Sequence, residues 1–346
     1  NSCILCARYQ PMTPGHDLGH QSLGMSWGDY LDAWVRESGG WTQLADALIG
    51  KAAGAVDISD DLQSVEKGLR RLARREHKSG GQYGRWMLRF FGVRRPVTDW
   101  LQWMGQYHTR FADLPATLRL EQLRLWNRPP IVESKWAAWI YVGLASVHLR
   151  LADVDSCRQW LGRADAMSPV IGAALQCEVD LLRAKLATDA GDRALAVECF
   201  GRVGERLEDA ALSETDRSCL GARLLGQRAY HLTKPQPGES ADYDGARRLF
   251  ESIDSNSQVP FVQFRRAAGL AYCAWKLGKT EQGIELAHRA LGHAGDGGLV
   301  RFRVMALNLL GSMADGDAAR VYLDRAERLA ARLEDEDLLQ RVARRR

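Results

Sequence analysis

The chain has 346 residues, of which 46% are hydrophobic and 26% charged, and 47 Lys and Arg residues against 43 Asp and Glu residues give a formal net charge of +4. This composition excludes a disordered or collagen-like chain and predicts a globular or repeat protein with a buried core. At roughly 150 residues per domain, the length predicts two domains. No apolar run approaches the roughly 20 residues that span a bilayer, so we expect a cytoplasmic protein with no membrane partner.

The first residues of the chain allow two interpretations. Cys3, Cys6, His16 and His20 have ligand types and inner spacings that suit tetrahedral zinc. The stretch between the two pairs is shorter than the roughly twelve residues found there in zinc fingers, and it contains prolines and a glycine in place of a hydrophobic pattern. We therefore expect residues 1–24 to form an unstructured leader that binds no metal.

Helix signals follow one another through residues 25–128 and predict a helical domain with an aromatic core. Ser26 can cap a first helix that Gly39 ends, and a second helix is expected from Trp41 to about Ile49. A third helix is expected from Ser59 to Glu76. Three more are expected near Trp86 to Phe91, after a cap at Thr98, and from Leu118 to Trp126.

Positive charge is concentrated around the third predicted helix. Residues 62–95 contain ten basic and two acidic residues, which gives this segment a charge of +8 and leaves −4 for the rest of the chain. On that helix, apolar residues recur at helical spacing along one side and Lys and Arg fill the other. The candidate contacts to nucleic acid or to an acidic partner are Lys67, Arg70, Arg71, Arg74, Arg75, Arg85, Arg89, Arg94 and Arg95.

Two functions fit this basic surface. In a helix-turn-helix-like domain, the third helix enters the major groove of double-stranded DNA, and arginine makes bidentate contacts to phosphate or guanine. Alternatively, the basic side chains form a solvated face or dock an acidic partner, because charge runs commonly mark surface. The loop from Gly50 to Ile58 is longer than the turn of a simple helix-turn-helix, which favours the second interpretation.

Residues 131–346 contain a degenerate repeat of small and apolar positions. Five equivalent residues lie 39, 42, 45 and 36 positions apart, namely Ala145, Ala184, Gly226, Ala271 and Leu307. Glycine-containing turns at 190–192, 277–279 and 315–317 separate the predicted helices within a unit. This pattern resembles the tetratricopeptide repeat (TPR), in which small residues let the two helices of a hairpin approach closely. The resemblance implies an all-α fold, with an α-solenoid of about five TPR-like hairpins after the N-terminal domain.

The resemblance also implies a concave groove that binds a protein or peptide segment, because the first helices of successive hairpins line the inner wall of a solenoid. From the phase of the repeat, we expect five polar side chains to face this groove and to pair with carboxylates of the ligand. They are Arg183, Gln227, Arg228, Arg265 and Arg266.

The sequence contains no pattern that predicts catalysis. The stretch from Cys273 to Thr280 ends like a phosphate-binding loop, but Cys273 replaces the first glycine and the repeat places Gly278 and Lys279 in a turn between helices. The histidines belong to no recognisable catalytic array. Five cysteines lie far apart within helix-like segments and are expected to be reduced and buried: Cys157, Cys177, Cys199, Cys219 and Cys273. We therefore expect no enzyme activity and no cofactor.

Two hypotheses for the whole chain follow. The first is a non-enzymatic TPR-like scaffold or adaptor that binds a protein or peptide. The alternative is a transcriptional regulator whose N-terminal domain binds DNA under the control of the repeats, a layout similar to that of bacterial regulators with an N-terminal helix-turn-helix-like domain. DNA binding that weakens steeply with salt is the property that separates them.

Overall fold

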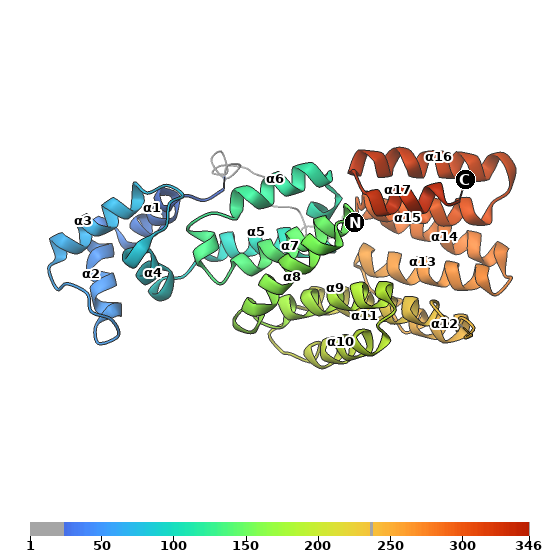
Figure 1. Ribbon diagram of the computed structural model, residues 1–346, viewed down its shortest axis with the longest axis horizontal. Helices are drawn as coiled ribbons and strands as arrows, with labels where there is room; N and C mark the ends of the chain where they lie inside the picture. Colours follow the sequence, from blue (N-terminus) through green and yellow to red (C-terminus); the bar gives the residue numbers. More distant parts are fainter. Residues whose placement is uncertain (1–23, 236–237, 346) are drawn as a thin grey trace, which may run out of the picture. The chain divides into compact units, whose positions relative to one another are not determined.

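The computed structural model describes residues 24–235 and 238–345. Within these ranges the fold is all-α, as predicted, with seventeen α-helices, three short 3-10 helices and no strand (Figure 1). The chain divides into two compact units. The first unit contains the described residues up to Arg94 together with Glu121–Ser134, and the second unit contains Arg95–Leu120 together with Lys135 and the residues that follow it.

Four helices form most of the first unit. They are α1 (Trp27–Ser38), α2 (Trp41–Ala52), α3 (Leu62–Ala73) and α4 (Gly81–Phe90). Helix α1 begins with the predicted cap, because Ser26 and Asp29 form a reciprocal capping box. It ends at Gly39, whose φ of 88° lies in the left-handed region that favours glycine. Helices α1, α2 and α3 pack against one another, and α4 packs against α2 and α3.

Aromatic side chains form the centre of the first unit. Trp27 is fully buried and its indole N–H donates to the carbonyl of Lys78 at 3.0 Å. Tyr30, also buried, donates its hydroxyl to the carbonyl of Gly92 at 2.7 Å. Helix α4 approaches Trp27 so closely that a Cβ at Gly84 would lie 2.8 Å from the indole. The aromatic core predicted from the sequence is therefore present, and it depends on a glycine at this helix contact.

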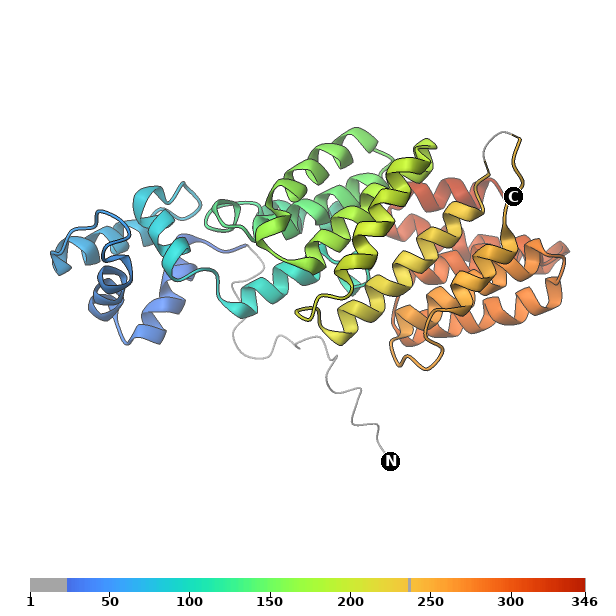
Figure 2. The ribbon, with the colours of Figure 1, turned by 90° about the horizontal axis from the view of Figure 1, so that it is seen from below.

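The second unit is built from antiparallel helical hairpins, which Figure 2 shows side by side in green, yellow and orange. Five pairs follow one another, and a single helix ends the chain. The helices are α7 (Ala137–Arg150), α8 (Val154–Met167), α9 (Ala173–Ala190), α10 (Arg193–Arg206), α11 (Glu214–Leu232), α12 (Tyr243–Glu251), α13 (Pro260–Lys276), α14 (Thr280–Asp296), α15 (Val300–Met313), α16 (Gly316–Leu333) and α17 (Glu336–Ala343). Helix α5 (Arg95–Gly105) also belongs to this unit, and α6 (Ala116–Trp126) runs from the second unit into the first.

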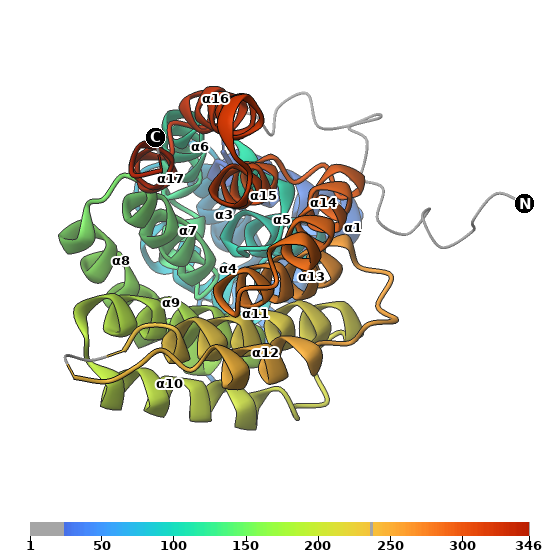
Figure 3. The same ribbon diagram turned by 90° about the vertical axis from the view of Figure 1, so that its right-hand side faces the viewer.

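The first helix of each of the five hairpins and the final helix α17 together form a closed ring. Helices α7, α9, α11, α13, α15 and α17 contact one another in this order, and α17 contacts α7 again. We call these six helices the helix ring. Helix α5, which packs against α7, lies inside the helix ring in Figure 3, and the 3-10 helix η3 (Arg110–Asp113) contacts both α5 and α15.

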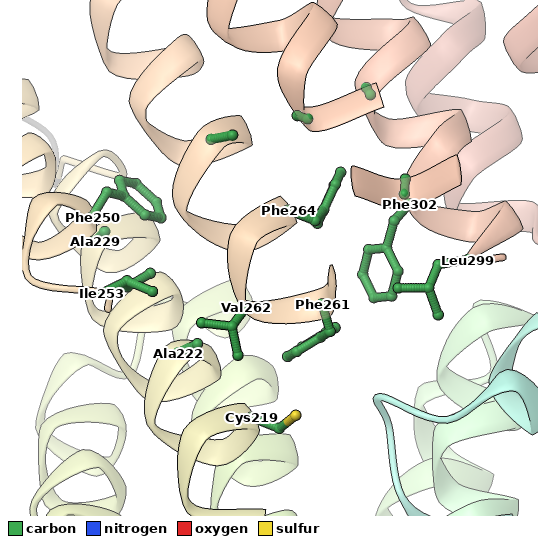
Figure 4. Packing of buried hydrophobic residues seen from close by; sticks show 14 of the residues in the cluster. Cys219, Ala222, Ala229, Phe250, Ile253, Phe261, Val262, Phe264, Leu299 and Phe302 are labelled. Carbon is green, nitrogen blue, oxygen red and sulfur yellow. The ribbon is translucent and has the colours of Figure 1, made fainter. Parts of the chain in front are cut away.

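The repeat positions identified in the sequence lie in the core of the second unit. Ala145, Ala184, Ala271 and Leu307 are fully buried on four of the ring helices, and Gly226 is buried on α11. The predicted turns at 190–192 and 277–279 separate α9 from α10 and α13 from α14, and the predicted turn at 315–317 overlaps the start of α16 at Gly316. Larger side chains fill the space between neighbouring hairpins; in the cluster of α11, α12, α13 and α15 these include Phe250, Phe261, Phe264 and Phe302 (Figure 4).

Three sequence expectations differ from the structure in detail. Helix α3 runs from Leu62 to Ala73 and is shorter than the expected range from Ser59 to Glu76; it begins after Asp61, whose carboxylate accepts from the backbone N–H groups of Gln63 and Ser64. Thr98 does not begin a helix but is buried inside α5, where its hydroxyl donates to the carbonyl of Arg95. The expected domain boundary near residues 128–131 does not coincide with the division into units.

The segment from Arg95 to Leu120 belongs with the hairpins because its apolar side chains are buried there. Leu101 and Met104 are fully buried, and Gly105 lies so close to Trp139 that a Cβ would be 2.6 Å from the Trp139 carbonyl oxygen. The candidate zinc ligands Cys3, Cys6, His16 and His20 fall outside the described residues. Among the described helices, none is long and apolar enough to cross a membrane.

Candidate functional site

The exposed side of α3 carries the basic face predicted from the sequence. Val65, Leu69 and Leu72 point into the core of the first unit, so the residues between them face solvent. Lys67, Arg70, Arg71 and Arg74 are exposed and follow one another along this side, with Gln63 at its N-terminal end. We call these five residues the α3 basic face: Gln63, Lys67, Arg70, Arg71 and Arg74.

Most of this positive charge is not neutralised within the protein. Among the described residues, Lys67, Arg71 and Arg74 have no carboxylate within ion-pair distance. Arg70 is different, because it pairs with Glu66 at 2.8 Å and its guanidinium lies 4.9 Å from the centre of the Trp41 aromatic system. A hydrogen bond from Thr42 and another from Arg70 lower the pKa of Glu66. Glu66 is therefore held as a carboxylate that orients Arg70, whereas its three neighbours are available to an external anion.

The other basic candidates lie away from the exposed side of α3. Arg75 donates to the carbonyl of Ser79 at 2.7 Å, and Arg94 pairs with Glu37 at 3.3 Å. Arg85 and Arg89 are exposed on α4. Arg95 begins α5 in the second unit and lies 3.7 Å from Asp99. The structure thus brings Lys67, Arg70 and Arg71 together on one side of α3, with Arg74 at its C-cap, and it gives Arg75 and Arg94 partners of their own.

The five residues predicted to line a peptide groove do not share one face. Arg183 pairs with Asp165 at 2.9 Å and with Asp180 at 3.2 Å, and Arg266 donates to the carbonyl of Ile253 at 3.1 Å.

Arg228 is exposed and lines a cavity of about 380 Å³ beside α10 and α12. Gln227 lies one turn of α11 beyond Arg223, and its side-chain oxygen is buried without a hydrogen-bond partner among the described residues. Arg265 alone of the five contacts the inner segment of the chain, since its guanidinium lies 5.6 Å from the centre of the Tyr107 phenol ring.

The interior of the helix ring holds a segment of the chain itself, residues 106–117, which the sequence analysis did not single out. Tyr107 of this segment lies between Phe261 and Phe302, at 6.3 and 5.9 Å between aromatic centres. The guanidinium of Arg223 is 4.3 Å from the phenol ring, and Arg301 donates to the phenol oxygen at 2.6 Å. Aromatic and cationic side chains from α11, α13 and α15 therefore surround one tyrosine.

The electrostatics of this pocket favour the ionised form of the phenol. Burial by itself would raise the pKa of Tyr107, but the guanidiniums of Arg301, Arg265, Arg223 and Arg150 outweigh burial and lower this pKa to about 7.

His108, the next residue, lies between two carboxylates. Its Nδ1 is 4.0 Å from Glu178 of α9, and its Nε2 is 3.8 Å from Asp216 of α11. Burial lowers the pKa of His108, opposed by the two carboxylates, and the nearby Arg223 lowers it further. Arg223 also pairs with Glu178. The imidazole is thus held in a buried ionic network that joins α9 and α11.

Side chains of the helix ring also contact the backbone of this segment. Glu178 accepts from the N–H of Tyr107 at 3.2 Å, and Arg150 of α7 donates to the carbonyl of Ala112. At the far end, Glu334 accepts from both the N–H and the hydroxyl of Thr117, at 2.8 and 3.0 Å. Such contacts are of the kind by which a receptor holds the backbone of a bound peptide.

Within the described residues, no group of three or more metal-ligating side chains is arranged to hold a metal ion. The five described cysteines are free and buried, as expected, and burial raises the pKa of the Cys157 and Cys177 thiols to about 12. Gly278 and Lys279 lie between α13 and α14, as the repeat predicted. No family model, no curated protein and no solved structure matches this chain.

Proposed function

We propose that the protein is a non-enzymatic DNA-binding protein that contacts duplex DNA through the α3 basic face. The observation that supports this proposal is the row of Lys67, Arg71 and Arg74, three exposed cations on one side of a helix without carboxylate partners among the described residues. In a transcriptional regulator, such a helix would be the element that contacts DNA. The opposite side of α3 is anchored in an aromatic core, so the row is presented on a fixed scaffold.

The dimensions of α3 suit the major groove. At 1.5 Å per residue its 12 residues span about 18 Å, and the major groove of B-DNA is about 12 Å wide, enough to admit a helix. Lys67, Arg71 and Arg74 are positioned to meet phosphates. Gln63, near the N-terminal end of the helix, can make a bidentate contact to adenine.

The test compares two matched triple variants of the full chain in binding to a fluorescent random-sequence duplex at several salt concentrations. Lys67→Ala, Arg71→Ala and Arg74→Ala together should weaken binding, and the slope of log affinity against log salt should fall by about three. The control replaces Arg325, Arg328 and Arg332, which are exposed on α16, by alanine. It removes the same charge and should leave both quantities near those of the unchanged chain.

Two results would reject DNA binding by α3. One is the absence of any complex at low salt, and the other is an equal loss of affinity in both triple variants. If the unchanged chain binds no DNA but binds an acidic polypeptide such as poly-glutamate, and the α3 variant does not, the α3 basic face is a docking surface for an acidic partner instead.

A second candidate function, binding of a protein or peptide, is supported by the interior of the helix ring. The inner sides of its helices present arginine, glutamate and aromatic side chains to residues 106–117. Glu178 and Arg150 bond the backbone of this segment, and Arg301 bonds the Tyr107 hydroxyl. The five-residue groove expected from the repeat phase does not carry this candidate, because only Arg265 among those residues contacts the inner segment.

A further inference from the structure

Residues 106–117 contact nearly every element of the helix ring. Their partners include Arg150 on α7, Glu178 on α9, Asp216 on α11, Phe261 on α13 and Arg301 on α15, and Glu334 before α17. A segment that only connected α5 to α6 would need none of these contacts. Its position is that of a ligand bound on the inner surface of a repeat domain.

The contact combines aromatic packing with buried charges, in contrast to the core of the first unit. That core consists of tryptophan, tyrosine and aliphatic side chains. Around residues 106–117, by contrast, charged groups are enclosed: His108 of the segment lies between Glu178 and Asp216, and Arg301 beside the segment pairs with the fully buried Asp335 at 2.8 Å. Replacing buried ion pairs by apolar side chains often increases stability, so such pairs are a poor device for holding a permanent core. They serve well to recognise a particular polar segment.

Three buried arginine N–H donors around the segment also have no acceptor among the described residues. Arg223 and Arg265 each have a buried Nε, and Arg150 a buried Nη2, with no hydrogen-bond partner among the described residues. A buried donor without an acceptor costs free energy. A different peptide that supplied acceptors at these three atoms would therefore replace residues 106–117 without losing the aromatic and ionic contacts.

We infer that residues 106–117 are an intramolecular ligand of the helix ring, and that a partner displaces them with a segment in which a tyrosine precedes a basic residue. This inference rests on the second candidate function, peptide binding by the helix ring. The tyrosine takes the place of Tyr107 between Phe261 and Phe302, and the basic residue takes the place of His108 between Glu178 and Asp216.

The attachment in the same chain makes residues 106–117 a strong competitor. A ligand tethered by a short linker has an effective concentration of the order of millimolar. A free peptide therefore has to bind well, or the tethered segment has to be weakened, before the exchange is seen at micromolar concentrations. The contacts of Tyr107 and His108 can be removed without changing the helix ring itself.

The probe is a fluorescein-labelled peptide with the sequence of residues 104–119. It is titrated with the full chain, with a Tyr107→Ala/His108→Ala variant, and with a control variant, His288→Ala/Tyr322→Ala. The control removes the same two residue types from α14 and α16, where they contact each other at 3.5 Å. We expect the probe to bind the first variant at least tenfold more tightly than the unchanged chain or the control. Binding should be lost when the tyrosine of the probe is alanine.

Circular dichroism establishes that each variant is folded. If Tyr107→Ala/His108→Ala does not fold, Tyr107→Phe decides, because it keeps the aromatic contacts and removes the phenol oxygen that bonds Arg301 and interacts with the other arginines. The loss of a hydrogen bond to a charged group should raise the affinity for the probe by about tenfold.

The other outcomes overturn the inference in distinguishable ways. Equal binding of the probe to the unchanged chain and to the folded variants would leave peptide binding standing, but would show that residues 106–117 do not compete for the site. Binding to none of the folded variants would reject both the intramolecular ligand and the second candidate function. Neither result depends on whether the α3 basic face binds DNA.

Discussion

Tyr107 has an environment unlike that of an ordinary tyrosine. Its phenol oxygen accepts from Arg301 at 2.6 Å, and the guanidiniums of Arg223 and Arg265 lie 4.3 and 5.6 Å from the phenol ring. Burial, which would raise the pKa of this group, is outweighed by these cations, and the pKa falls from 10.0 to about 7. Ionised Tyr107 is therefore the form that the arginines of the helix ring favour.

We expect one tyrosine of the folded protein to ionise near pH 7. Titration followed by tyrosinate absorbance should show a step there that is absent from Tyr107→Phe. Because the pKa is lower in the folded than in the unfolded state, this group adds stability as pH rises from about 7 toward 10, and the contribution is lost as pH falls through 7. Identical titrations of the two proteins, with all tyrosines ionising in the ordinary range, would contradict the assignment.

At the scale of elements, the first unit depends on the close approach of α4 to α1. Gly84 lies in the middle of α4, and a Cβ there would be 2.8 Å from the Trp27 indole. The indole cannot move aside easily, since it is fully buried and donates to the carbonyl of Lys78. The distance between α1 and α4 therefore depends on glycine, which has no side chain, at position 84.

Gly84→Ala should lower the free energy of unfolding by about 1–3 kcal/mol, the usual cost of overpacking. Gly50→Ala is the matched control, because Gly50 also lies within a helix, α2, but has nothing within 4 Å of the added Cβ. The control should raise the free energy of unfolding by about 0.5–1 kcal/mol through helix propensity alone. Urea denaturation measures both, and equal effects of the two substitutions would show that the contact with Trp27 is not tight.

The elements that the sequence predicted well are those that local patterns specify. The capping residue Ser26, the end of α1 at Gly39 and the apolar side of α3 depend on residues within a few positions of one another. The expected range of α3, Ser59 to Glu76, was wider than the helix observed from Leu62 to Ala73, because Ser59 and Asp61 are both residue types found at helix starts. Only the hydrogen bonds of the Asp61 carboxylate show where the helix begins.

The inner residues of the helix ring were harder to predict, because neighbouring residues on a helix point about 100° apart. Arg265 contacts Tyr107, whereas Arg266, the next residue, donates to the carbonyl of Ile253. The repeat phase placed the small buried positions, such as Ala184 and Ala271, correctly. A degenerate repeat with steps of 36 to 45 residues cannot fix the direction of a long polar side chain within such an angle.

At the scale of the whole molecule, the position of residues 106–117 could not be predicted from the sequence. Read locally, Tyr107, His108 and Arg110 form a polar connection between two helices. Tyr107 and His108 are buried or paired because of Glu178, Asp216 and Arg301, which lie about 70 to 190 residues further along the chain. The charge pattern of the sequence drew attention to α3, where the cations are exposed, whereas the charges inside the helix ring largely cancel.

The two units therefore differ in what holds them together. The first unit has an apolar aromatic core, and its two carboxylates with lowered pKa values, Asp61 and Glu66, lie at the surface. The second unit encloses ionised groups. Burial would raise the pKa of Asp335, but Arg301 and Arg150 outweigh burial and lower it. Burial raises the pKa of Asp113. Its contribution to stability therefore decreases as pH rises, whereas that of Asp335 increases.

His108 makes the second unit the more acid-sensitive one above pH 5. Burial lowers the pKa of His108, so the folded state keeps the imidazole neutral while the unfolded state takes up a proton below about 6.5. Stability from this group is present at higher pH and is lost as pH falls below 6.5. The contribution of Asp335 is lost only at lower pH, as the pH falls below its ordinary value of 3.8 and through the folded pKa.

Scanning calorimetry between pH 7 and pH 5 should therefore resolve two transitions, of which the one belonging to the second unit moves to lower temperature. In His108→Gln, which cannot be protonated, this transition should move much less over the same range, and the transition of the first unit should be unchanged. An equal shift in the unchanged chain and in His108→Gln would show that the imidazole is not the acid-sensitive group. Glu178, Asp216 and Arg223 remain in both proteins, so they cancel from the comparison.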